Sequence, residues 1–245
     1  MRREPISSEY PVHIIRKGAR GLPFAYDDTE RWRNLQTLFY FNDCSSRVNW
    51  FRELEEKRKN AKKENKKDYF FSWPEFWPER EPLLSIWSFS FNYNHDHIIA
   101  QQIEDDGVSK FMQKFNISTA KRFNDRHNQK GSVLQPYVIK VIDSDNYLQW
   151  VVPYVVVKNT FEMHPKGYKW AVNNFEKAWE WAIQFPFSSL ADILGLRNSP
   201  VVDVSRLREI LGTPDEIKKL CRDMITTREE IEKEKMNNIR HFSYE

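Results

Sequence analysis

Residues 91–99 read Phe-Asn-Tyr-Asn-His-Asp-His-Ile-Ile and follow directly on an apolar stretch at residues 83–89, Leu-Leu-Ser-Ile-Trp-Ser-Phe. The mixture of large apolar and small residues before the turn predicts a β-strand. The Asn-Tyr-Asn segment predicts a turn, and residues 95–101 predict the returning strand. Successive side chains of a strand point to opposite faces, so His95 and His97 lie on one face of this hairpin and Asp96 on the other.

Two imidazoles at this spacing suit a metal site. His95 and His97 can bind one divalent metal and leave coordination positions open, which is typical of a catalytic site rather than a closed structural one. The alternative is a pair of solvated histidines at a strand end. The spacing alone does not decide between the two.

The composition sets outer limits on the function. The chain has 245 residues, long enough for one large domain or one domain with an appendage, and a net charge of +3, which permits a nucleic-acid partner without requiring one. It has no apolar run of about 18 residues and no signal-peptide core at its start, so we expect a cytoplasmic protein with no membrane partner. Cys44 and Cys221 are far apart, which favours incidental thiols over a disulfide framework.

Further elements around the hairpin predict the fold class. In chain order the predicted elements are strand, helix, strand, strand, helix and strand, which together form an α+β, ferredoxin-like sandwich with an antiparallel sheet. Besides the hairpin, they are a strand at residues 10–16, a helix starting at residues 27–29, a helix at 108–127 and a strand at 133–142.

The remainder of the chain is predicted to be helical. A helix at residues 146–158 is expected to kink or break at Pro153, and three more are expected at residues 169–184, at 204–211 and from Thr213-Pro214 onward. We therefore predict a catalytic domain at residues 1–160, with an insertion at about 52–82, and a C-terminal helical extension at 161–245.

Basic side chains cluster in three places, and each cluster has two interpretations. Residues 57–67 form a basic run next to aromatic residues 69–77; it is either a solvated segment or an arm that contacts a nucleic-acid backbone. The other two clusters are a loop and a helix whose cations either face water or contact phosphates. They are Arg16, Lys17 and Arg20 in the loop, and Lys110, Lys114, Lys121, Arg122 and Arg126 in the helix.

An ordered set of motifs along the chain resembles the REP-associated tyrosine transposases, a family of single-tyrosine HUH transposases of insertion sequences. The resemblance spans nearly the whole chain. The motifs are His-Ile-Ile-Arg-Lys-Gly at residues 13–18, Tyr-Asn-His-Asp-His-Ile-Ile at 93–99, Phe-Met-Gln at 111–113, Phe-Asn-Asp-Arg-His at 123–127, Asp-Asn-Tyr-Leu at 145–148 followed by Tyr154, and Pro-Lys-Gly-Tyr-Lys-Trp at 165–170.

The resemblance implies a HUH-type fold and a DNA transposition or recombination activity. In that family single-stranded DNA, usually with a hairpin, is cleaved and rejoined through a 5′-phosphotyrosine, here on Tyr154. His95 and His97 would hold Mg²⁺ or Mn²⁺, and the basic loop and helix would contact the DNA. Lys158 and Asn159 are possible auxiliary residues. The protein would act as a monomer or a homodimer.

One departure keeps other functions open. The family places an Asn four residues after the nucleophile, whereas this chain has Lys158 there and Asn159 one residue later. The alternatives are a catalytically inactive, transposase-derived DNA-binding protein and a metal-dependent hydrolase that activates water. A covalent protein–DNA adduct would distinguish them.

Overall fold

The computed structural model describes residues 6–45, 51–56 and 71–242, with side chains up to Glu229 in the last helix. The predicted basic run at residues 57–67 lies outside these ranges. Within them, no helix is both long and apolar enough to cross a lipid bilayer.

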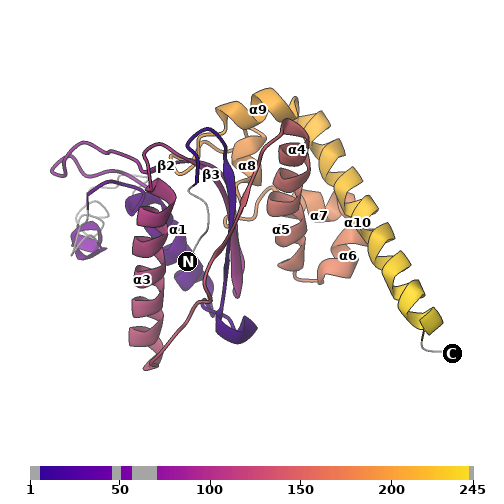
Figure 1. The fold of residues 1–245 in the computed structure, drawn as a ribbon, viewed down its shortest axis with the longest axis horizontal. Helices are drawn as coiled ribbons and strands as arrows, with labels where there is room; N and C mark the ends of the chain where they lie inside the picture. Colours follow the sequence, from indigo (N-terminus) through magenta and orange to yellow (C-terminus); the bar gives the residue numbers. More distant parts are fainter. Residues whose placement is uncertain (1–5, 46–50, 57–70, 243–245) are drawn as a thin grey trace.

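In the described part of the chain, four antiparallel strands form one sheet in the order β2-β3-β1-β4. This order, with helices α1 and α3 as connections, is the ferredoxin-like α+β topology predicted from the sequence. Figure 1 shows α1 and α3 on one side of the sheet and the helices that follow β4 on the other. The elements are β1 (Val12–Lys17), α1 (Asp28–Tyr40), β2 (Leu84–Phe91), β3 (His95–Gln102), α3 (Gly107–His127) and β4 (Val138–Val141).

The side of the sheet that faces α1 and α3 is largely apolar but contains a buried ion pair. Arg16 of β1 and Asp96 of β3 lie directly opposite each other, and the Arg16 guanidinium binds the Asp96 carboxylate. Arg16 is only 1% exposed, and its guanidinium carbon lies 3.6 Å from the centre of the Phe115 ring. The predicted DNA contact of Arg16 is therefore wrong: strand alternation turns it into the core, where it neutralises Asp96.

The other side of the sheet carries the histidines. It is covered by α4 (Asp145–Pro153), a π turn η2 (Tyr154–Lys158) and α5 (Asn159–Glu162). Buried valines of this segment pack on Ile99 and on the C-terminal helices in one apolar cluster. These helices are α6 (Tyr168–Asn173), α7 (Phe175–Ala182), α8 (Leu190–Ile193), α9 (Ser205–Leu211) and α10 (Pro214–Phe242).

Several predicted boundaries differ from the observed ones. The predicted break of the helix at residues 146–158 is confirmed: α4 ends at Pro153, because proline has no N–H to continue the hydrogen-bond ladder, and a π turn follows it. The helix expected at 169–184 is two helices, broken where Asn174 leaves helical geometry (φ −127°, ψ 50°). The last strand covers only Val138–Val141 of the predicted 133–142, and α8 was not predicted.

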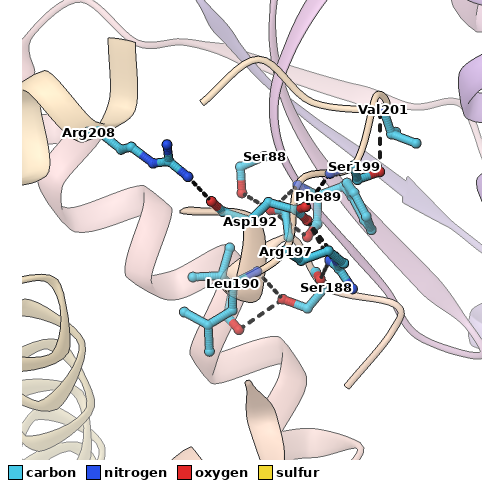
Figure 2. Close-up of polar contacts among 11 residues, drawn as sticks. Ser88, Phe89, Ser188, Leu190, Asp192, Arg197, Ser199, Val201 and Arg208 are labelled. Carbon is cyan, nitrogen blue, oxygen red and sulfur yellow. Dashed lines mark hydrogen bonds and ion pairs between the residues drawn. The ribbon is translucent and has the colours of Figure 1, made fainter. Parts of the chain in front are cut away.

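Residues 187–189 attach the C-terminal helices to β2. The Phe91 N–H donates to the Phe187 carbonyl at 2.8 Å, and the Ser189 N–H donates to the Phe89 carbonyl at 3.0 Å. Figure 2 shows how the following turn is held. The Asp192 carboxylate accepts from Arg197 at 2.5 Å and from the Ser199 N–H at 2.9 Å, while Arg208 donates to the Asp192 carbonyl at 2.6 Å.

Candidate active site

Three histidines of adjacent strands share one face of the sheet. The rings of His95 and His97 are perpendicular, with centroids 5.2 Å apart. His13 of β1 joins them: its Nε2 lies 2.8 Å from Nδ1 of His97. His13 and His97 are each 3% exposed. The predicted His95–His97 pair is thus brought together, and the structure adds a third imidazole that was not predicted as part of the site.

Burial keeps the inner two imidazoles neutral. It lowers the pKa of His13 to about 4, with a further contribution from the nearby Lys140 charge. It also lowers the pKa of His97 well below the ordinary value, assisted by His13, His95, Lys158 and Lys17. In the hydrogen bond between them one ring donates its N–H and the other accepts it, so the tautomers of His13 and His97 are linked.

Tyr154 lies against this histidine pair. It is the first residue of η2, and its ring centroid lies 5.6 Å from that of His97 and 6.4 Å from that of His13. Its ring also stacks on Trp150, one helical turn earlier, at 5.8 Å with an interplanar angle of 10°. The structure therefore places the predicted nucleophile beside the predicted metal-binding histidines.

A hydrogen-bonded group of side chains surrounds His95 on the side of α5. Lys158 Nζ is 2.6 Å from Glu162 Oε1, and Glu162 Oε2 is 3.3 Å from His95 Nε2. Asn92, next to the turn of the hairpin, donates to Glu162 at 3.4 Å. Burial alone would raise the pKa of Glu162, but the hydrogen bonds from His95 and Lys158 outweigh it and lower the pKa. Glu162 is therefore a carboxylate at neutral pH and holds both partners in place.

The π turn brings Asn159 into register with Tyr154. The Asn159 N–H donates to the Tyr154 carbonyl, five residues earlier. In a regular α-helix the donor to that carbonyl would be Lys158, four residues after Tyr154. Asn159 is 0% exposed, and its side-chain amide has no hydrogen-bond partner among the described residues. Lys158 instead places its ammonium 5.1 Å from the centre of the Tyr154 ring.

The donor set around the histidines suits a metal ion in kind but not in number. Two imidazoles and a carboxylate are ligands that Mn²⁺ accepts. Yet in residues 6–45, 51–56 and 71–242 no three His, Cys, Asp or Glu side chains are placed so that they could hold a metal ion. His95 and His97 thus remain a two-ligand arrangement, with Glu162 as the nearest further donor.

The other predicted DNA-binding residues divide into two groups. Lys17 and Arg20 are exposed, and Lys17 lies directly opposite His95, on the histidine face. The residues of α3 lie on the far side of the sheet from Tyr154. There, Lys114 Nζ donates to the Asp43 carbonyl at 2.8 Å, Lys110 Nζ to the Asp105 carbonyl at 3.2 Å, and Arg126 pairs with Asp27 at 2.7 Å. Lys121 is exposed and Arg122 is half-buried.

Sequence reasoning missed four members of the site: His13, Asn92, Trp150 and Glu162. Two of them had a usable signal. His13 falls in the predicted strand of residues 10–16, and alternation with the buried Arg16 would have placed it on the opposite face from that residue. Trp150 is four residues before Tyr154 in a predicted helix, a spacing that makes two side chains neighbours. Asn92 and Glu162 depend on how the helices cross the sheet.

No protein-family model and no curated protein matches the sequence. Among solved structures the chain is similar to a REP-associated tyrosine transposase bound to a REP hairpin, with 14% sequence identity. The similarity covers 84% of this chain and 92% of that chain, with a TM-score of 0.41.

Proposed function

We propose that this chain cleaves and rejoins single-stranded DNA through a covalent 5′-phosphotyrosine on Tyr154. The observation that carries the proposal is the position of the Tyr154 ring, 5.6 Å from the His97 ring and on the face that also bears His95. A hydroxyl nucleophile held next to side chains that can bind a metal ion suits covalent catalysis. The motif resemblance supplies the substrate class, a single strand that contains a hairpin.

In the proposed reaction the Tyr154 hydroxyl oxygen attacks the scissile phosphorus in line with the bond to the 3′ oxygen. A tyrosine–phosphorus bond forms, the bond to the 3′ oxygen breaks, and that oxygen leaves as a 3′-OH after taking up a proton. The phenol proton passes to a solvent water molecule, while Nδ1 of His97 stays bonded to His13 at 2.8 Å. Attack by the 3′-OH of a second strand reverses the step and rejoins the DNA.

Two cations flank the nucleophile. Lys158 Nζ lies 5.1 Å and the Arg228 guanidinium 5.3 Å from the centre of the Tyr154 ring. Positive charge at this range attracts the phosphate of an incoming strand. Arg228 comes from α10, so the C-terminal helix would contribute to the proposed site.

We also propose Mg²⁺ or Mn²⁺ as the cofactor. Nδ1 of His95 is bonded to Asn94 at 2.8 Å, and Nδ1 of His97 is bonded to His13 at 2.8 Å. Both rings would therefore use Nε2 toward an ion, oriented by these outer partners. His95 Nε2 would exchange its present contact with Glu162 Oε2, at 3.3 Å, for that ion. When bound, the ion would act as a Lewis acid toward the scissile phosphate.

The test is a search for the covalent adduct. A single strand with a hairpin and a 3′-end label is incubated with the protein and Mg²⁺ or Mn²⁺, and label that stays with the protein on a denaturing gel is measured. The proposal expects labelled protein from the wild type, none from Tyr154→Phe, and none after chelation of the metal. Label retained by Tyr154→Phe at the wild-type level would contradict the role of Tyr154.

A catalytically inactive DNA-binding protein is the second candidate. It is favoured by the lack of a three-ligand metal cluster in the described ranges and by the ion pair that ties Lys158 to Glu162. This candidate expects single-strand binding by the wild type with no adduct under either metal. The same gel, combined with a binding titration, separates the two functions.

A further inference from the structure

Trp150 is an exposed aromatic side chain next to the proposed nucleophile. One face of its indole stacks on Tyr154, yet the residue is 46% exposed and lies outside the apolar clusters that the described residues form. The aromatic residues that follow it on the same side of the sheet are far better covered; Phe161 is 0% exposed and Trp179 is 7% exposed. Trp150 therefore presents a large flat apolar surface to solvent beside Tyr154.

The sheet surface around the histidines that Tyr154 contacts is basic. Lys140 of β4 lies opposite His13, and Lys17 of β1 lies opposite His95, so both lysines share the histidine face. Both are exposed, and no carboxylate of the described chain forms an ion pair with either. Val138 of β4 lies opposite Ile15, on the same face as Lys140, and is 50% exposed. The histidine face of β1 and of the edge strand β4 thus carries two exposed lysines and an exposed valine next to His13 and His95.

An aromatic surface beside unpaired lysines is complementary to one class of ligand. Single-stranded nucleic acid offers flat bases that stack on aromatic rings and phosphates that pair with cations. A folded protein partner would instead need a wider apolar patch than one indole and one valine provide. A duplex keeps its bases stacked on each other, so its bases could not use the indole face.

We propose that Trp150 is a stacking platform for one unpaired base next to the scissile phosphate, and that Lys17 and Lys140 bind the neighbouring backbone phosphates. This inference rests on the proposed function, because it takes single-stranded DNA as the ligand. Stacking tolerates any base, since every base has a π face. The platform would fix the strand so that one phosphate lies beside the Tyr154 hydroxyl, while sequence recognition would come from elsewhere.

The experiment is a coupling measurement between the indole and a single base. Binding is measured in the Tyr154→Phe background, which keeps the ring beneath Trp150 but cannot cleave. The probes are hairpin-flanked single strands, each with one abasic nucleotide at a successive position. With Trp150 present, one abasic position should weaken binding by about tenfold, as expected for the loss of one stack.

Trp150→Ala should bind the intact strand about tenfold more weakly and should no longer respond to the abasic position. Trp150→Phe should keep most of both effects. Phe76→Ala is the matched control, because Phe76 is 66% exposed and packs against Trp77, on the α1 and α3 side of the molecule. It should behave like the parent.

The outcomes separate this inference from the proposed function. Adduct formation without any Trp150-dependent abasic position overturns the platform and leaves the chemistry intact. A Trp150-dependent position without any adduct supports the platform and overturns the chemistry. Failure of the parent protein to bind any single strand overturns both. Thermal melting of Trp150→Ala checks that a loss of binding is not a loss of folding.

Discussion

The N–H of Asn159 donates to the carbonyl of Tyr154 across five residues, and this single wide turn reconciles the sequence with the geometry of the site. A π turn contains one residue more than the α-helical turn it replaces. The extra residue gives the Asn159 N–H the backbone bond that Lys158 would make in a regular α-helix. We propose that Asn159 thereby takes the place of the Asn that the motif resemblance puts four residues after the nucleophile.

Replacing Tyr154 with Phe should abolish adduct formation and leave the fold unchanged. The ring contacts with Trp150 and His97 survive, and no hydrogen bond joins the Tyr154 hydroxyl to another described residue. We expect a change of less than about 1 kcal/mol in the free energy of unfolding. Denaturing gels and a urea titration measure the two effects. Tyr147→Phe and Tyr168→Phe should still form adduct; loss of adduct in either one instead would assign the nucleophile elsewhere.

Removing His13 should damage both stability and activity. His13→Ala leaves Nδ1 of the buried His97 without its partner at 2.8 Å, which should cost about 1–3 kcal/mol in unfolding free energy. It also releases the tautomer of His97, so adduct formation should slow. His13→Gln can place an amide near the original Nε2 and should recover part of both losses. If Ala and Gln behave alike, the hydrogen bond is not what His13 contributes.

Stability should fall as the solution is acidified from about pH 6.5 toward pH 4. Burial lowers the pKa of His13 to about 4, whereas an unfolded histidine titrates near 6.5. Between these values the unfolded chain binds the proton and the folded chain does not, so the stabilisation is complete above pH 6.5 and is lost as the pH falls. The contribution is of order 3 kcal/mol. Urea titrations at several pH values should show this slope, and His13→Gln should reduce it.

The Arg16–Asp96 pair should be needed for folding and not for direct contact with DNA. Truncating either partner leaves the other charge buried and unpaired, and we expect a loss of about 3–5 kcal/mol for Arg16→Ala or Asp96→Ala. Arg16→Met combined with Asp96→Leu should lose much less, because neither charge is then stranded. Urea titrations of the three variants provide the measurement. If Arg16→Ala is fully stable but binds DNA more weakly, Arg16 contacts DNA directly and its burial has been misjudged.

Lys17→Gln and Lys140→Gln should each weaken single-strand binding by a similar factor for every sequence tested. Each substitution removes one phosphate contact, so the slope of log affinity against log salt should fall by about one. Lys114→Gln is the control: its ammonium already binds the carbonyls of residues 43–45, on the other side of the sheet. Titrations at several salt concentrations decide the matter. An effect of Lys114→Gln equal to that of Lys17→Gln would relocate the DNA to α3.

The parts of the molecule that follow local rules could be predicted from the sequence. Strand alternation and turn residues gave the hairpin at residues 91–99, and capping gave the start of α1, where the Asp27 side chain accepts from the Glu30 N–H. The sheet order followed from the sequence of elements. Alternation also bears on the burial of Arg16, because a residue opposite Asp96 must share its buried face.

Other features depend on contacts between distant segments and have no local signature. The bond between Glu162 and His95 requires α5 to cross the end of β3, and the contact of Tyr154 with His97 requires η2 to lie on the histidine face. The wide turn after Pro153 has a local cause, since proline interrupts the ladder. Its length is nevertheless set by the packing of buried Val155, Val156 and Val157 against the sheet and the last helices.

The hydrogen bonds from residues 187–189 to β2 have a consequence for the solubility of shortened chains. They occupy backbone groups of an outer strand whose side chains include Phe89 and Phe91. A polypeptide that stopped before residue 187 would expose this strand to other copies, and an unpaired apolar edge is a template for aggregation. We expect chains cut near residue 160 to precipitate even if their sheet forms. The last third of the sequence would therefore prevent self-association through β2.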